Sequence, residues 1–147
     1  MVKGSCFCGQ CSYAAAGELF DVMHCHCSTC RKLHGSAFAT YAGVLEAGFN
    51  WLCDTSKIRE FKTSKNVTRY FCGSCASLLT SVDTSEPHTI YLSVGLVDSD
   101  ISIAPEYHQF TESKAPWYEI SDALPRYKGE YNAVSYTHLT LPTNREV

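Results

Sequence analysis

The chain has 147 residues, of which 45 % are hydrophobic and 18 % are charged, a composition typical of one globular domain. Its formal net charge of −3, without any block of like charges, argues against a nucleic-acid backbone or an anionic membrane surface as a partner. No apolar run approaches the length of a membrane helix, about 18 residues. Residues 1–6 lack the apolar stretch of a secretion signal, so we expect a cytoplasmic protein.

Strands make up most of the predicted elements, and we therefore expect a mainly β fold. The distribution of β-branched, aromatic and alternating apolar residues predicts strands over residues 12–16, 37–44, 67–72, 78–82 and 89–94. The last of these is the clearest, because Ile90, Leu92 and Val94 fall on one face. Composition predicts a turn over residues 84–87.

One short helix is predicted over residues 28–34. It ends at Gly35, a residue that commonly closes helices, and Ser28 or Thr29 is expected to cap its start. Cysteines lie at the entry to this helix, where the helix dipole and free backbone amides favour thiolates.

The pattern of alternating segments stops after Tyr127. Residues 132–147 mix polar and scattered apolar residues without a period, and residues 134–144 resemble the read-through tail of a truncated gene model. We therefore expect one domain over residues 1–127 and a tail over residues 128–147 that is disordered or non-native.

Nine cysteines are the strongest functional signal in the sequence. Their odd number and the missing leader favour metal ligands or catalytic thiols over disulfides. They form three groups and one outlier, namely Cys6, Cys8 and Cys11, then Cys25, Cys27 and Cys30, then Cys72 and Cys75, with Cys53 alone. A pair of cysteines on one tight turn presents two sulfurs at the separation that tetrahedral zinc requires.

The spacing predicts two zinc ions. Cys72 and Cys75 form a zinc knuckle that needs a second pair, and Cys6 with Cys8 is the matching candidate for a closed structural site. The second group then holds a zinc ion with only Cys25, Cys27 and Cys30, which leaves one position open to a substrate thiol. In the alternative, Cys11 completes the second site, and the chain carries two closed structural zinc sites without chemistry.

Three other residues near the motifs receive lesser roles. We interpret Cys53 as a core thiol rather than a ligand. His24 and His26 flank the ligands, and we expect supporting or surface roles for both, because the C-x-C turn already fills two metal positions.

The same residues resemble those of the glutathione-dependent formaldehyde-activating enzyme family, which includes centromere protein V-like proteins. The resemblance rests on residues 4–9 (GSCFCG), 24–32 (HCHCSTCRK) and 71–75 (FCGSC), with further similarity at residues 113–117 and 124–127. It implies an antiparallel β-tent fold, a structural zinc on Cys6, Cys8, Cys72 and Cys75, and a catalytic zinc on Cys25, Cys27 and Cys30.

Two residues depart from the family pattern. Cys11 stands where an apolar or basic residue is common, which keeps the closed-site alternative open. Ala76 stands where glycine is usual, and it is strained by about 1 kcal/mol if that position requires a positive φ angle.

The resemblance implies a zinc-dependent carbon–sulfur lyase-type enzyme that joins glutathione to a small aldehyde such as formaldehyde. Glutathione carries two carboxylates, so its pocket needs cations, and Arg31 and Lys32 are the nearest candidates in the sequence. Lys114 and Arg69 are further candidates, each with a solvated surface position as the simpler interpretation. For Trp117, core packing is the simpler interpretation and a place in the pocket wall is the alternative.

Two rival functions remain at this stage. The first is a non-catalytic zinc module that binds other proteins. The second is a methionine sulfoxide reductase of the B type, which requires two C-x-x-C pairs and a separate redox cysteine, whereas Cys72 and Cys75 form the one clean pair outside the second group.

Overall fold

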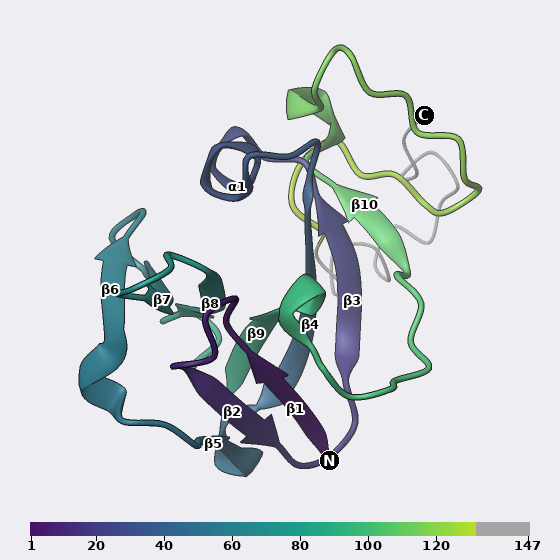
Figure 1. Ribbon diagram of the computed structural model, residues 1–147. Helices are drawn as coiled ribbons and strands as arrows, with labels where there is room; N and C mark the ends of the chain where they lie inside the picture. Colours follow the sequence, from purple (N-terminus) through teal and green to yellow (C-terminus); the bar gives the residue numbers. More distant parts are fainter. Residues whose placement is uncertain (132–147) are drawn as a thin grey trace. The chain divides into compact units, whose positions relative to one another are not determined.

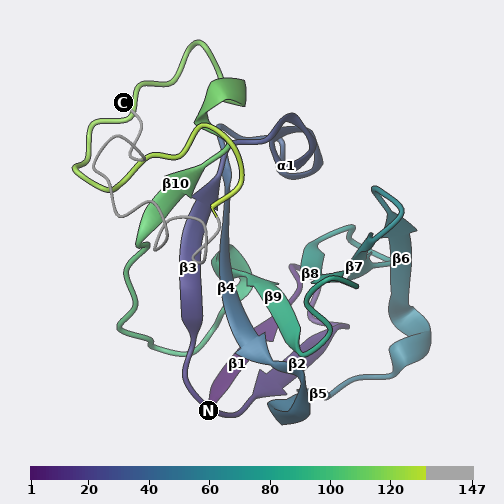
Figure 2. The same cartoon turned by 180° about the vertical axis from the view of Figure 1, so that it is seen from behind.

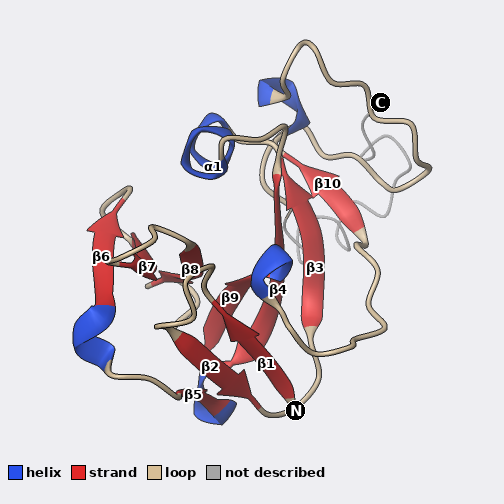
Figure 3. Cartoon of the chain, in the orientation of Figure 1, coloured by secondary structure: helices blue, strands red, loops and turns tan. Residues whose placement is uncertain are grey.

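The computed structural model describes residues 1–131, and strands dominate this part of the chain (Figure 3). The strands are β1 (Val2–Ser5), β2 (Ser12–Ala15), β3 (Phe20–Cys25), β4 (Ala39–Leu45), β5 (Phe49–Trp51), β6 (Ile58–Lys62), β7 (Val67–Cys72), β8 (Leu78–Asp83), β9 (Thr89–Ser93) and β10 (Tyr107–Gln109). The described residues also contain one α-helix, α1 (Ser28–His34), and the single-turn 3-10 helices η1 (Glu46–Gly48), η2 (Thr55–Lys57), η3 (Val94–Leu96) and η4 (Thr111–Ser113). The mainly β class and the one short helix are as predicted.

The chain divides into two compact units. Unit 1 comprises Met1–Asp21 and Tyr41–Ile103, and the described part of unit 2 comprises Val22–Thr40 and residues 104–131. Strands β3 and β4 each pass from one unit into the other. No helix in the described part of the chain is long and apolar enough to cross a membrane.

Unit 1 is built on antiparallel strands. Strands β1, β2 and β5 form a three-stranded sheet, and β4, β9, β8, β7 and β6 follow one another in a second sheet (Figure 1). The unit's main core lies where the inward faces of β1, β2, β4 and β9 meet. Its buried residues are Val2, Tyr13, Ala15, Val44, Ile90 and Leu92.

Gly4 permits this core to close. Its strand β1 pairs with β2, so that Gly4 lies opposite Tyr13, whose side chain is fully buried. A Cβ atom at Gly4 would lie 2.3 Å from the Tyr13 hydroxyl oxygen, well inside van der Waals contact. The ring therefore fills the space that any larger residue would take.

Unit 2 contains α1 and a parallel pair of strands, β10 beside β3 (Figure 2). Their register places Tyr107 opposite Met23, His108 opposite His24 and Gln109 opposite Cys25. This parallel pair is an exception to the antiparallel arrangement expected from the family resemblance. It brings a segment that carried no sequence signal next to the second cysteine group.

Most sequence-predicted elements are present. The strand predicted over residues 67–72 and the helix predicted over residues 28–34 match β7 and α1, and the other predicted strands match within two residues at each end. Val94 is the exception on the clearest strand, because it begins the 3-10 helix η3. Strands β1, β3, β5, β6 and β10 were not predicted, since most are short or combine charged, aromatic and small residues without alternation.

The prediction for the start of the helix was wrong. Neither Ser28 nor Thr29 caps α1, because Cys27 occupies the N-cap position and its sulfur accepts a hydrogen bond from the Cys30 amide at 3.2 Å. The prediction for the end was correct, since Gly35 adopts the left-handed conformation with φ 60°.

The packed part of the chain continues past Tyr127. Phe110 donates its amide hydrogen to the Gly129 carbonyl at 2.9 Å, and the Tyr131 ring lies 4.4 Å from that of Tyr107. The rest of the expected tail, residues 132–147, lies outside the described residues.

Replacing Gly4 with alanine is expected to destabilise the protein by about 1–3 kcal/mol, the usual cost of overpacking a core. The reason is the clash with Tyr13, which cannot move without opening the core. Urea denaturation of the zinc-loaded protein measures the change. Gly95→Ala is the matched control, since a Cβ there meets nothing within 4 Å, and equal stability of the two variants would contradict this account.

Candidate metal centres

Four cysteines of unit 1 form a compact group of sulfurs. Cys6 and Cys8 lie after β1, Cys72 ends β7 and Cys75 lies in the next turn, and all four sulfurs are within 4.8 Å of one another. The Cys6 and Cys8 sulfurs are 3.6 Å apart, and those of Cys8 and Cys72 are 3.7 Å apart. A zinc–sulfur bond of about 2.3 Å gives a tetrahedral sulfur–sulfur edge of about 3.8 Å, so this group fits a four-coordinate zinc ion.

Backbone amides hold these sulfurs in place. The Cys11 amide donates to the Cys6 sulfur at 3.3 Å, and the amides of Ser74 and Cys75 donate to the Cys72 sulfur at 3.3 and 3.4 Å. Such contacts stabilise thiolates, the form in which cysteine binds metal. The knuckle turn closes through Ala76, whose amide donates to the Cys72 carbonyl at 2.8 Å.

The thiols of this group differ in the direction of their pKa shifts. The Ser77 hydroxyl lowers the pKa of Cys75 to about 5, and donation from the Cys75 amide lowers the pKa of Cys72. At Cys8 the Gln10 amide acts in the same direction, but burial and the neighbouring sulfurs prevail and raise the pKa to about 11. Cys72 and Cys75 thus ionise more readily than an ordinary thiol and Cys8 less readily, so a bound cation would be needed to ionise Cys8.

Cys11 lies beside this group in unit 1. It is fully buried, packs in the same core as Cys6, Cys72 and Leu79, and directs its sulfur toward the Lys57 carbonyl oxygen at 3.8 Å. Burial raises the pKa of its thiol, as does the neighbouring Cys72. Cys53 is half-buried and packs against the same core, in line with its interpretation as a core thiol.

The second group of sulfurs comes from one short segment of unit 2. Cys25 ends β3, Cys27 caps α1 and Cys30 lies in the first turn of the helix, with all three sulfurs within 4.8 Å of one another. Cys25 and Cys30 are almost fully buried. Among the described residues of unit 2, no histidine, aspartate or glutamate joins this group as a fourth ligand.

Thiols that lie so close together resist ionisation. The hydrogen bond with the Cys27 thiol raises the pKa of Cys25 well above its usual range, and Cys30 and burial contribute to the same shift. Metal binding by this group therefore releases protons. Sulfur is the ligand type that zinc accepts in both closed and open sites, so the three sulfurs fit zinc as the four do.

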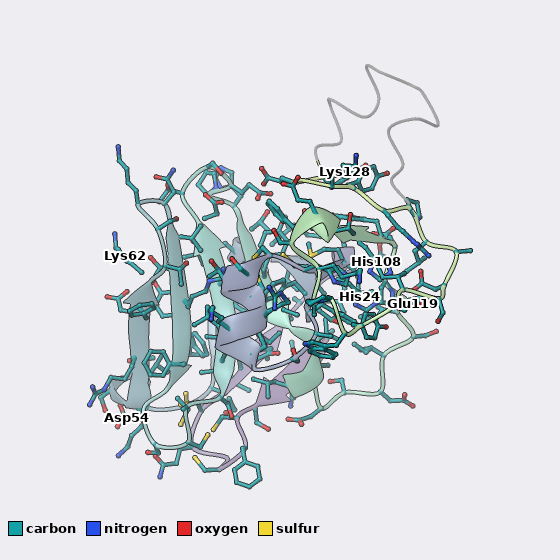
Figure 4. The ribbon with its side chains drawn as sticks, turned by 90° about the horizontal axis from the view of Figure 1, so that it is seen from above. His24, Asp54, Lys62, His108, Glu119 and Lys128 are labelled. Carbon is teal, nitrogen blue, oxygen red and sulfur yellow. The ribbon has the colours of Figure 1, made fainter. Side chains whose placement is uncertain are left out.

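Three histidines lie close together next to this group, with His26 and His108 buried and His24 half-buried. His26 Nε2 lies 2.8 Å from His108 Nδ1, and His108 Nε2 lies 2.9 Å from Asp122 Oδ2. The His24 ring lies 4.9 Å from that of His108, and the two are labelled in Figure 4. Burial and the neighbouring His108 lower the pKa of both His24 and His26 to about 4. His26 is thus buried and His24 half-buried, and neither side chain belongs to the group of sulfurs.

The candidate cations lie in different surroundings. Arg31 is half-buried and its Nε donates to the Ser113 carbonyl at 3.1 Å, whereas Lys32, the next residue on α1, is exposed. Lys114 follows the same turn, and its ammonium group donates to the carbonyls of Ala115 and Tyr118. Arg31 and Lys114 are close enough to His26 to contribute to its lowered pKa.

Two expectations about other residues were wrong. Arg69 is a buried residue of unit 1, not a surface charge, and its guanidinium donates to the Tyr41 hydroxyl at 2.7 Å. Trp117 does not pack in the core, since 71 % of its side chain is exposed. Arg69 has a structural partner because Tyr41, a buried residue of β4 in the same sheet, supplies an acceptor in the interior.

Sequence reasoning missed Ser77, His108 and Asp122. Ser77 lies two residues after Cys75, where a serine is an ordinary turn residue and gives no separate signal. His108 lies on the three-residue strand β10, which is too short for a periodic pattern, and its contact with His26 spans 82 residues. The pairing of His108 with His26 becomes visible only once the register of β10 against β3 is known.

The comparisons with known proteins agree with this geometry. The family model of the glutathione-dependent formaldehyde-activating enzyme matches residues 1–113, a span that includes all seven clustered cysteines, and the chain belongs to this family. A crystal structure of a Rhodobacter sphaeroides protein shares the fold, with a TM-score of 0.57 and 20 % sequence identity over 67 % of this chain and 90 % of that chain. No curated protein matches the chain.

Ala76 adopts a φ angle of 66°, the left-handed conformation that was expected to strain alanine at this position. Ala76→Gly is therefore expected to stabilise the zinc-loaded protein by roughly 0.5–1 kcal/mol, since glycine tolerates this conformation. Urea denaturation measures the gain. At the exposed Ala47 of η1, which lacks a positive φ angle, the same change should lower stability, and a loss at both positions would disprove strain at the knuckle.

Proposed function

We propose that this protein is a zinc-dependent carbon–sulfur lyase-type enzyme that joins a thiol, glutathione, to a small aldehyde such as formaldehyde. The observation that carries the proposal is the unequal number of sulfurs in the two groups, four in unit 1 and three in unit 2. A closed site needs four ligands, whereas a reactive site keeps one position free. Membership of the family supports the same assignment.

Each group of cysteines has its own role in this proposal. Cys6, Cys8, Cys72 and Cys75 hold a structural zinc, and Cys25, Cys27 and Cys30 hold the catalytic one. When bound there, zinc supplies a Lewis acid with room for a substrate sulfur or oxygen. Three thiolates against two positive charges leave this site with a net charge of −1, which favours keeping a substrate thiolate nucleophilic over strong activation of water.

The chain's own residues prepare the catalytic site. The Cys30 amide donates to the Cys27 sulfur and stabilises it as a thiolate, while β3 and the first turn of α1 fix the three sulfurs in one place. The reaction forms a bond between the glutathione sulfur and the aldehyde carbon. The electron pair of the carbonyl π bond moves to oxygen, and that oxygen takes the proton that the thiol has given up.

Cations near the second group would bind the carboxylates of glutathione. We assign this role first to Arg31, whose Nε is held by the Ser113 carbonyl and whose other nitrogens can form a bidentate contact, then to Lys32 and Lys114. A cytoplasmic location fits this proposal, because cysteines that bind zinc must stay reduced, and none of the nine forms a disulfide.

Cys27→Ser should abolish the activity and remove one zinc equivalent while the other zinc stays bound. Serine retains the helix cap that Cys27 provides, so the loss isolates the sulfur ligand from the fold. Zinc analysis and formaldehyde-dependent consumption of glutathione measure the two effects. Cys53→Ser is the control and should keep both zinc ions, because Cys53 belongs to neither group. Two zinc ions retained in the Cys27 variant would refute the assignment.

Arg31→Ala should raise the KM for glutathione about 10-fold or more, as expected for one lost charge-assisted hydrogen bond. With 2-mercaptoethanol, which lacks a carboxylate, the same variant should match the unmodified protein. Lys32→Ala should have a smaller effect, since Lys32 is exposed, and Lys65→Ala in unit 1 should have none. An equal effect of Arg31→Ala on both thiols would show that Arg31 does not bind the carboxylates.

A further inference from the structure

A chain of hydrogen bonds in unit 2 has no part in the function proposed above. It runs from Asp122 through His108 to His26, with contacts of 2.9 Å and 2.8 Å. His26 and His108 are 0 % and 1 % exposed, and they come from segments 82 residues apart in the sequence. Only the Asp122 end reaches the surface, where 43 % of its side chain is exposed.

The chemistry of the end groups fixes which atom donates in each hydrogen bond of this series. An ionised carboxylate only accepts hydrogen bonds, so His108 must donate from Nε2 to Asp122. With both rings neutral, His108 Nδ1 is then an acceptor, and His26 must donate to it from Nε2. At the far end, His26 Nδ1 is buried and has no hydrogen-bond partner among the described residues. Nothing there competes with Asp122 in setting the tautomers.

The hydrogen-bonded series from Asp122 to His26 is connected to the three-sulfur group through the backbone of His26. His26 lies between Cys25 and Cys27, and side chains alternate between faces along an extended segment, so its ring lies on the face opposite the two sulfurs. The rings of His24 and His26 both contact Phe38, as this alternation requires. The His26 amide also donates to the Gln109 carbonyl of β10 at 3.0 Å. His26 is therefore fixed to β10 by backbone and by side chain.

We propose that Asp122 and His108 are positioning residues, which hold His26 in a single tautomer and so fix the Cys25–Cys27 segment from behind its sulfurs. The positioning role in catalysis rests on the proposed function, whereas the order of the tautomers does not. Groups that orient metal ligands in this way usually change metal affinity or activity by about 10- to 100-fold when they are replaced.

Asp122→Asn tests the direction of the chain with little change in shape. The Asp122 Oδ1 atom accepts from the Leu124 amide at 3.0 Å, and an asparagine oxygen can keep this contact. His108 Nε2 lies 2.9 Å from Oδ2 and 3.1 Å from Oδ1, so the asparagine nitrogen replaces the nearer oxygen, while the oxygen that remains is shared with the Leu124 amide. The nitrogen faces Nε2 as a donor, and two donors repel each other at this distance. His108 must accept there, so both rings should change tautomer, and His26 Nδ1 should become protonated.

Two-bond proton–nitrogen NMR of the zinc-loaded protein, labelled at its histidines and recorded at pH 8, reads these tautomers directly. We expect protonated Nε2 and unprotonated Nδ1 at His26 and His108, and the opposite pattern in Asp122→Asn. The variant should bind two zinc ions and lose about 10- to 100-fold in kcat. Glu119→Gln is the matched control, because it removes the same charge from an exposed residue of the same segment and should change neither result.

The outcomes separate this inference from the proposed function. The inference is overturned if the unmodified protein shows Nδ1-protonated or doubly protonated rings, if Asp122→Asn leaves the tautomers unchanged, or if it lowers thermal stability without lowering kcat. A protein without activity on thiols and aldehydes that still shows the expected tautomers and their reversal would reject the proposed enzyme and retain the hydrogen-bond chain.

Discussion

The close approach of the sulfurs in unit 1 is the constraint on which the rest of that unit depends. Cys8 and Cys72 are 64 residues apart in the sequence, yet their sulfurs lie 3.7 Å apart. A structural zinc ion contributes roughly 10–16 kcal/mol in small domains. Closing a loop of this length costs much less, because the entropy grows only with the logarithm of length. The metal can therefore hold the β1–β2 connection against the turn after β7 and replace a larger apolar core.

The two sulfur groups are assembled in different ways. The four sulfurs of unit 1 come from two distant turns, so their geometry exists only once the sheets have formed. The three sulfurs of unit 2 come from six consecutive residues, and α1 holds two of them within one turn. A local group of this kind closes no long loop and adds little to global stability. Its precision must come from neighbouring supports, namely the cap at Cys27 and the strand β10 beside β3.

The sequence was sufficient for the local features and insufficient for the distant ones. Turn spacing identified all seven clustered cysteines, and Gly35 marked the end of α1, because both signals lie within a few residues. The cap at Cys27 was missed because oxygen side chains dominate N-cap preferences, whereas here a sulfur takes that place. The contacts of His108 depend on the parallel register of β10, and the partner of Arg69 depends on the sheet, so neither pair could be predicted from patterns along the chain.

The pKa shifts distinguish the two groups in how their metal binding depends on pH. In unit 1, the Ser77 hydroxyl and backbone amides lower the pKa values of Cys75 and Cys72, whereas burial and the neighbouring sulfurs raise the pKa of Cys8. In unit 2, mutual hydrogen bonds and burial raise the pKa of Cys25, so a metal ion must displace protons from a shared network. Proton release makes binding to the three-sulfur group weaken more steeply as pH falls. We therefore expect metal binding by the three-sulfur group to be the more sensitive of the two to acid, because the four-sulfur group contains two thiols whose pKa is lowered.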